Sequence, residues 1–426
     1  MNIDKNDSGR SPTRRDVLCT TLGAFGLTAL GPIGEAFAAT RPASARPRPA
    51  SSQKFLVVVE LDGGNDGLNM AVPQGLSNYA LRRPSLALGT GDTLPLDTGL
   101  YATGEFRLHG RMPRLAQMYR DGELAIVSKV GYPDANQSHD TSKLIWASGQ
   151  REGLLGTSGW IARYAELEAP TSLGAIGVRR GRHRSLGGGS SNPLTLDTLG
   201  AFRFDADGAF SANHTKRLEI IRDLLAAQPA SAPRDALLTG HELADQIGAA
   251  VSGYVSTADY GTSRIGLAMR DIAMMLQANF ETRVFYTGFG GFDTHAAQGT
   301  TTGRQPDLLE DLDEAMFGFS EDCKAMGIWN NAVVLVISEF GRRNFENGSA
   351  GTDHGGANTV LVTGGAARGG LHGVAPTEAD LDRNFLPYSV DFRAVYSNIL
   401  TEHLGMADAG LVFREPYQSP TQVDLV

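Results

Sequence analysis

Carboxylate, imidazole and hydroxyl side chains recur in five short segments of this chain, four of which contain glycine. These segments are residues 62–67, 138–142, 290–295, 338–342 and 352–358. Carboxylate oxygens and imidazole nitrogens together ligate divalent cations or act as general acids and bases. Their recurrence therefore predicts a metal or acid–base site, and an enzyme is the leading hypothesis.

Six side chains in these segments are candidate metal ligands because of their type and their glycine-rich setting. They are Asp62, Asp293, His295, Glu339, Asp353 and His354. Ligands of this mixed kind suit zinc, magnesium, manganese or calcium, so the sequence predicts a divalent metal ion without selecting one. For residues 62–67 the alternative is an Asp- and Gly-rich turn with a purely structural role.

The segment 138–142 has the composition of a loop that enters a helix. A hydroxyl at a helix N-terminus lies where the end amides stabilise negative charge, so Ser138 and Thr141 are candidate nucleophiles. His139 is a candidate ligand or base. The alternative is that these side chains only cap the helix. Arg342 is a candidate for binding a phosphate-like oxyanion, or it pairs with Glu339 as part of the structure.

Hydrophobic runs precede these segments and must position them. Residues 55–61, 124–127, 284–287 and 333–337 are continuous apolar runs, as expected for strands of a parallel sheet that is covered on both faces. The carboxyl ends of such strands lie along one edge, where ligands bind. Apolar residues spaced by three and four predict helices between the strands. The expected fold class is α/β, a three-layer doubly wound, mostly parallel sheet.

Composition divides the chain into three parts. Residues 1–38 have the features of a twin-arginine signal peptide: Arg14 and Arg15, a weakly apolar stretch, and small residues before a cleavage site. Residues 39–54 are expected to form a disordered linker. Residues 55–426 are expected to form a single α/β domain, in which the Gly-rich residues 171–233 are an insertion or cap.

The same features predict the location of the protein and its binding partners. The twin-arginine export machinery is the first expected partner, and the mature protein is expected in the periplasm or outside the cell without a stable membrane anchor. A net charge of −9 and a pI near 5.5 argue against nucleic acid as a partner. The basic residues 179–184 are interpreted as a solvated surface loop, and the alternative is that they guide an anionic substrate. The expected substrate is an anionic small molecule or polymer.

Several motifs together resemble the family catalogued as domain of unknown function 1501, which comprises exported bacterial proteins. The resemblance covers nearly the whole chain. It rests on the twin-arginine start and on the runs at 61–66, 138–139, 291–295, 338–342, 353–355 and 391–393. That family is similar to the alkaline phosphatase and sulfatase superfamily. The resemblance therefore implies an alkaline-phosphatase-like core with two metals at its carboxyl edge.

The resemblance also implies roles for individual residues. Asp62 matches a first-strand aspartate ligand, and His354 matches a late histidine ligand. Glu339 takes the place of the aspartate in a strand-end Asp-His pair. Phe340 takes the place of that pair's histidine, and a benzyl group cannot ligate a metal. Two functions follow: a metal-dependent hydrolase of phosphate or sulfate esters, or a non-catalytic secreted binding or assembly protein that keeps the fold.

Overall fold

The structure is a computed structural model, and it describes most of the chain after residue 51. The described residues are 52–96, 106–154, 156–191, 193–201, 214–251, 254, 256 and 258–426. The predicted signal peptide and nearly all of the predicted linker lie outside them. Among the described residues, no helix is both long enough and apolar enough to cross a membrane.

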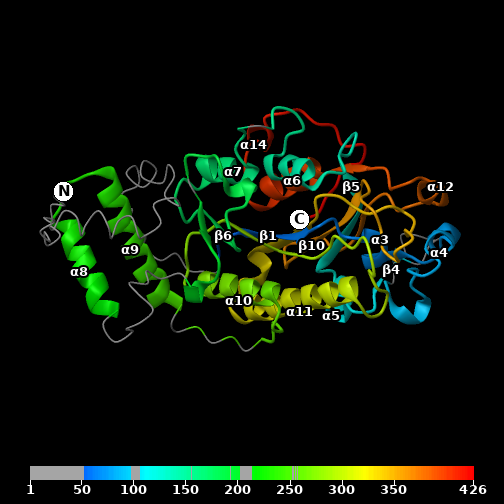
Figure 1. Cartoon of the computed structure of the whole chain (residues 1–426), viewed down its shortest axis with the longest axis horizontal. Coiled ribbons are helices and arrows are strands. Elements are labelled where there is room, and N and C mark those ends of the chain that lie inside the picture. The colour runs from blue at the N-terminus through cyan, green and yellow to red at the C-terminus, as the bar shows by residue number, and fades with distance from the viewer. Residues whose placement is uncertain are drawn as a thin grey trace, which may run out of the picture. The chain divides into compact units, whose positions relative to one another are not determined.

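One large sheet forms the centre of the fold (Figure 1). Its strands run in the order β11-β5-β10-β9-β1-β8-β6-β7, and β12 also pairs with β5. All of these pairings are parallel except those of β10, which is antiparallel to β5 and β9. The strands are β1 (Phe55–Asp62), β5 (Leu124–Gly131), β6 (Ala175–Val178), β7 (Leu194–Leu196), β8 (Val284–Gly290), β9 (Ala332–Ile337), β10 (Asn358–Thr363), β11 (Gly370–Gly373) and β12 (Val390–Asp391).

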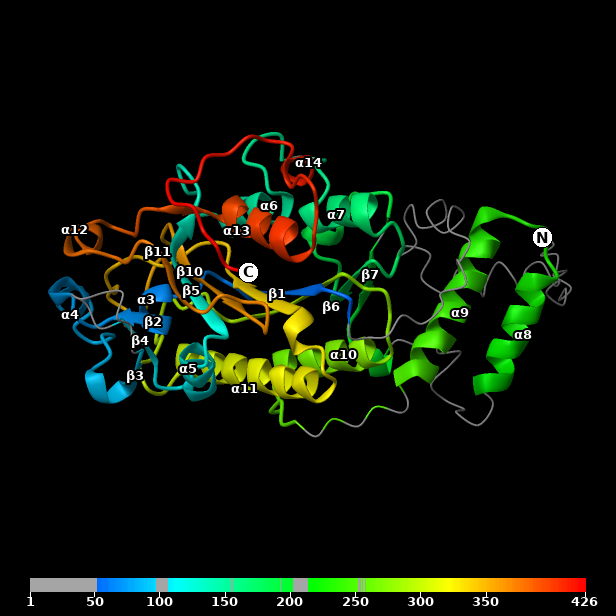
Figure 2. The same ribbon diagram turned by 180° about the vertical axis from the view of Figure 1, so that it is seen from behind.

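Helices cover both faces of this sheet, which makes three layers (Figures 1 and 2). One face packs against α6 (His139–Ser148), α7 (Trp160–Glu168), α13 (Phe392–Asn398) and α14 (Gly410–Phe413), whose apolar side chains share one core with the strands. The opposite layer comprises α5 (Pro113–Arg120), α10 (Arg264–Gln277) and α11 (Arg304–Ala325). Because both faces are covered, the central strands are buried along their length, as the continuous apolar runs predict. The predicted fold class is confirmed.

Smaller elements surround this core. A second sheet contains β2 (Ala71–Pro73), β4 (Phe106–His109) and β3 (Thr93–Pro95) in that order. The short helices are α3 (Gly67–Met70), α4 (Ser77–Arg82), α12 (Glu378–Leu381), the 3₁₀ helices η3 (Thr90–Asp92), η4 (Arg184–Leu186), η5 (Leu199–Ala201) and η7 (Trp329–Asn331), and the π-helix η8 (Ile399–His403).

The chain separates into two compact units. The smaller unit comprises residues 1–43 and 204–243, and the larger comprises the rest. Of the smaller unit the structure describes α8 (His214–Ala226) and the first part of α9 (Ala232–Val251). α8 lies within residues 171–233, which the sequence predicts to be an insertion or cap. The predicted domain boundaries remain a prediction.

The register of the central strands explains why the site forms at one edge. Asp62 at the end of β1 pairs with Gly290 at the end of β8, and Glu60 pairs with Ile337 at the end of β9. These three strands therefore end together. Because β10 is antiparallel, the connection from β9 to β10 starts and finishes at that same edge. Residues 338–357 consequently stay beside the segments that follow β1 and β8.

Candidate metal centre

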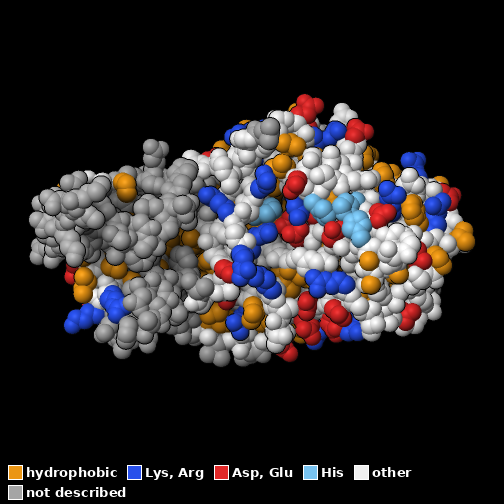
Figure 3. Space-filling view, in the orientation of Figure 1, with side chains coloured by type: hydrophobic (Ala, Val, Ile, Leu, Met, Phe, Trp, Pro, Cys, Tyr) orange, Lys and Arg blue, Asp and Glu red, His pale blue; other side chains and the backbone are white. Residues whose placement is uncertain are grey.

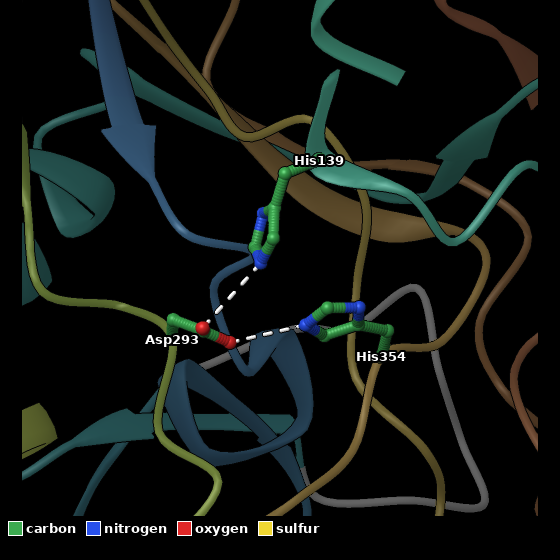
Figure 4. Close-up of side chains that lie close together, drawn as sticks. All are labelled: His139, Asp293 and His354. Atoms are coloured by element: carbon green, nitrogen blue, oxygen red, sulfur yellow. Dashed lines mark hydrogen bonds and ion pairs between the residues drawn. The ribbon is translucent and has the colours of Figure 1, made fainter. Parts of the chain in front are cut away.

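Three side chains that are far apart in the sequence meet at this edge (Figure 4). His139 is the first residue of α6, Asp293 follows β8, and His354 lies in the connection from β9 to β10. One potential ligand atom from each lies within 4.8 Å of the others. Histidine side chains also gather on one face in the space-filling view, beside acidic and basic groups (Figure 3).

His139 and His354, together with the neighbouring His295, are each oriented by an oxygen atom that accepts a hydrogen bond from Nδ1. Nδ1 of His354 lies 2.8 Å from the Gln137 carbonyl oxygen. Nδ1 of His139 lies 2.9 Å from Oε1 of Glu339, and Nδ1 of His295 lies 3.1 Å from Oδ1 of Asp353. A carbonyl or carboxylate oxygen only accepts, so each Nδ1 donates a proton. In the neutral rings this leaves the Nε2 lone pairs available as ligands.

Those Nε2 atoms converge on one carboxylate. Oδ1 of Asp293 lies 3.1 Å from Nε2 of both His295 and His354, and Oδ2 lies 3.4 Å from Nε2 of His139. Nε2 of His295 and Nε2 of His354 are only 2.9 Å apart. Two acceptor nitrogens at this separation repel unless a proton or another cation lies between them. The geometry is therefore that of a site for positive charge.

The pKa values of the cluster reflect the same charges. The hydrogen bond to Glu339 raises the pKa of His139, against the opposing effect of partial burial. Burial lowers the pKa of His354, which favours its neutral, ligating form. Burial would raise the pKa of Asp293, but the hydrogen bond from Arg342 and its positive charge outweigh burial and lower that pKa to about 2. Asp293 is thus an anion across the physiological range.

Arg342 positions Asp293 and does not face a ligand. Its Nη2 donates to Oδ1 of Asp293 at 2.7 Å. Its other donors reach the carbonyl oxygens of Gly63, Gly64, Phe292 and Thr352, and the side chain is buried. A guanidinium with these contacts is not free to bind an oxyanion. The predicted catalytic role of Arg342 is therefore corrected to a positioning role, because its donors are already used.

Lys143 is a site residue that the sequence analysis missed. Its Nζ donates to Oδ1 of Asp62 and lies 3.7 Å from Oε1 of Glu339. Burial opposes the charge of Lys143, but the hydrogen bond to Asp62 and the negative charge of Glu339 raise its pKa. The sequence does contain a signal. Lys143 follows His139 by four residues, so both side chains lie on one face of α6.

Glu339 and Phe340 complete the inner wall of the site. The Glu339 carboxylate accepts from the amide of Gly63 at 3.0 and 3.2 Å and is buried. The ring of Phe340 packs against His139 and His354, with centroids 5.0 and 4.6 Å away. A Cβ on Gly64 would lie 2.2 Å from Phe340 Cε2, so only glycine fits there. Phe340 therefore supports the histidines without ligating.

The remaining predicted residues lie around this centre. Asp353 orients His295, and a hydrogen bond from Asn347 lowers the pKa of Asp353. Ser138 is the exposed N-cap residue of α6, and its side chain makes no capping hydrogen bond. Thr141 lies two residues after His139, about 200° around the helix axis. That geometry places Thr141 away from the cluster and argues against it as the nucleophile.

A second charged group lies nearby and corrects the interpretation of the basic loop. Glu60 is buried, and Arg179 donates to its Oε2 at 2.8 Å. His183 Nε2 lies 3.5 Å from Oε1 of Glu60, and its ring stacks on Tyr286. Residues 179–184 are therefore not simply a solvated loop. Tertiary packing brings two of their side chains onto a buried acid, which no local pattern indicates.

The comparison with family models agrees with the motifs. Residues 247–408 match the model described as "Protein of unknown function (DUF1501)". The predicted resemblance to this family is confirmed over that segment, which contains Asp293, His295, Glu339, Asp353 and His354. The segments that hold Asp62 and His139 lie outside the match. No curated protein matches the chain.

Solved structures of phosphatase- and sulfatase-type proteins are similar to this chain at low identity. PsFucS1 sulfatase from Pseudoalteromonas sp. is 9% identical, with 97% of this chain and 74% of that chain covered and a TM-score of 0.38. A protein in the alkaline phosphatase superfamily from Vibrio parahaemolyticus is 9% identical, with 80% and 69% covered and a TM-score of 0.31. At such scores, function must be argued from the site itself.

Proposed function

We propose that the protein is an exported metal-dependent hydrolase of phosphate or sulfate esters. One observation carries the proposal. His139, His295 and His354 each have Nδ1 bound to an oxygen acceptor, and their Nε2 atoms converge on Asp293. An oriented imidazole with a carboxylate or carbonyl behind it is the usual arrangement of a metal-ligating histidine.

The donor set fits a divalent transition metal. His139, His295, His354 and Asp293 would hold the ion, with Glu339 and Asp353 behind two of the rings. Imidazole ligands suit zinc and its transition-metal neighbours better than magnesium or calcium, which prefer oxygen. When bound, such an ion supplies Lewis acidity, which polarises an ester oxygen.

The chain's own residues would supply the rest of the chemistry. Ser138 Oγ is the proposed nucleophile, because it lies exposed at the N-terminus of α6 beside His139. Attack on phosphorus or sulfur forms a seryl ester and releases the alcohol, and water then hydrolyses that ester and regenerates the hydroxyl. The Lys143 ammonium and the amides of α6 would stabilise the negative charge of the group in transfer.

The proposal is tested by metal content together with turnover. The protein, purified without chelator and incubated with zinc or manganese, is expected to retain about one ion per chain and to hydrolyse aryl phosphate or aryl sulfate esters. His354→Ala and Asp293→Asn should lose both properties. His372→Ala is the matched control, because His372 lies in β11 and its Nε2 is 2.8 Å from the Arg368 carbonyl oxygen, away from the cluster. A folded wild-type protein that binds no ion would refute the proposal.

The alternative is a non-catalytic binding or assembly protein, and Phe340 is the observation that favours it. Phe340 stands where the superfamily pattern has a ligating histidine, and it is buried against the imidazoles. The two functions differ in turnover. A protein that binds one ion yet hydrolyses none of a broad panel of phosphate and sulfate esters would support the binding role.

Export by the twin-arginine machinery, with function in the periplasm or outside the cell, is part of the proposal. It rests on Arg14, Arg15 and the apolar stretch that follows them. Localisation of a tagged full-length chain tests this part separately from the chemistry.

A further inference from the structure

Two acidic side chains at the site contact an ammonium group, and neither is the carboxylate on which the histidine Nε2 atoms converge. Asp62 and Glu339 are both expected as metal ligands from the sequence. In the structure Lys143 Nζ donates to Asp62 Oδ1 and lies 3.7 Å from Glu339 Oε1. The Lys143 ammonium is therefore a counter-ion of the Asp62 and Glu339 carboxylates.

The position of Lys143 is fixed by the helix that carries it. Ser142 Oγ, one residue earlier, donates to the Glu339 carbonyl oxygen at 2.6 Å and also lies 2.8 Å from the Tyr132 hydroxyl. These contacts attach the first turn of α6 to the segment after β9. The Lys143 stem then reaches across to the end of β1 while its side chain keeps 26% of its surface exposed.

A divalent ion could not join this pair while the ammonium stays. It would have to lie within about 2–2.5 Å of Asp62 Oδ1, the oxygen to which Nζ donates, and on the side that faces Glu339. Two cations at that separation repel strongly in a half-buried site. Conversely, removal of the ammonium would take the cation away from between Asp62 and Glu339, although Glu339 would still accept from His139 and Gly63. Two neighbouring carboxylates without the lysine attract a hard cation.

We infer that Lys143 acts as the second cation of this site and thereby limits the centre to one metal ion. Its ammonium neutralises Asp62 and Glu339, and its positive charge would favour the binding of an anionic ester. The statement about the ester rests on the proposed function. The statement about metal number depends only on the contacts of Lys143 with the two carboxylates.

The test is the number of ions bound by Lys143→Gln, which removes the charge and keeps a polar side chain. Each variant is equilibrated with manganese, a metal that accepts both carboxylate and imidazole, and is analysed by elemental mass spectrometry and titration calorimetry. We expect about one ion in the wild type, two in Lys143→Gln and one in Lys143→Arg. The extra ion should disappear in the double variant Lys143→Gln/Asp62→Asn.

The outcomes separate this inference from the proposed function. A wild type without metal refutes the metal-dependent hydrolase, yet one ion gained by Lys143→Gln would still support the role of Lys143. A folded Lys143→Gln variant that binds no more metal than the wild type overturns the inference, whatever the activity. Lys143→Met is the second variant, in case Gln fails to fold or donates its own hydrogen bond to Asp62.

Discussion

A 2.7 Å hydrogen bond joins Nη2 of Arg342 to Oδ1 of Asp293, and three histidines gather around the carboxylate that it holds. The two partners differ in environment, because the Arg342 side chain is fully buried whereas 45% of the Asp293 side chain is exposed. The buried cation thus fixes the position and the charge of an anion that solvent and ligands can reach.

Loss of this buried cation should affect both folding and metal binding. Arg342→Met is expected to lower the free energy of unfolding by about 3–5 kcal/mol. The substitution removes the hydrogen bonds to several buried carbonyl groups and the cation that pairs with Asp293. Urea unfolding measures the change. Arg383→Met, at an exposed position, is the control. Equal stability of the two variants would contradict the positioning role.

Asp353 should matter for metal affinity more than for stability. Its carboxylate holds Nδ1 of His295 and is itself 39% exposed. Asp353→Ala is expected to weaken metal binding about 10- to 100-fold, the usual effect of removing a group that orients a ligand. Calorimetric titration with zinc gives the dissociation constant. Asp134→Ala, whose side chain is 92% exposed, should bind as the wild type does; equal affinity in both variants would argue against His295 as a ligand.

Acid should destabilise the fold through His403. Burial lowers the pKa of His403 from 6.5 to about 4, and its Nε2 lies 3.0 Å from the Phe55 carbonyl oxygen. Between these two pH values the unfolded chain binds a proton that the folded chain does not. Stability is therefore full above pH 6.5 and falls as the pH drops toward 4, by roughly 3 kcal/mol from this group.

The His403 prediction is checked by urea unfolding at several pH values. His403→Gln cannot titrate, and its amide keeps a donor for the Phe55 carbonyl, so its stability should vary less between pH 6.5 and 4 than that of the wild type. Identical pH profiles for the two proteins would show that other groups cause the acid sensitivity.

Export should depend on the paired arginines. Replacement of Arg14 and Arg15 together by lysine keeps the charge, yet it is expected to leave the precursor in the cytoplasm, because the pathway recognises the arginine pair and not basic charge alone. Cell fractionation with immunodetection measures the exported share. Arg10→Lys should be exported normally, and efficient export of the double variant would exclude this route.

The parts of the site that the sequence predicts are those fixed by strand ends. Continuous apolar runs identify β1, β8 and β9, and parallel strands place the residues after them at one edge. Asp293, His295 and His354 are found together for that reason. The antiparallel direction of β10 was not predicted, because an apolar run carries no information on direction.

The partners of the long cationic side chains were not predictable in the same way. The Arg342 guanidinium donates to backbone carbonyl oxygens of three separate segments. Every residue has a backbone carbonyl, so the amino-acid sequence does not indicate which ones accept. Lys143 was missed although its spacing from His139 is regular, since a lysine on a helix usually faces water. Only the tertiary structure shows that the position of α6 brings the Lys143 ammonium into contact with Asp62.

The separation of these residues along the chain has a consequence for folding. The hydrogen bond from His139 to Glu339 spans 200 positions, and that from His354 to Gln137 spans 217. No short fragment can assemble the cluster, so it can form only after the long-range pairing of the sheet, which is intrinsically slow. Binding of a ligand at the cluster would therefore show that the sheet has assembled. A nascent or nicked chain would not bind that ligand.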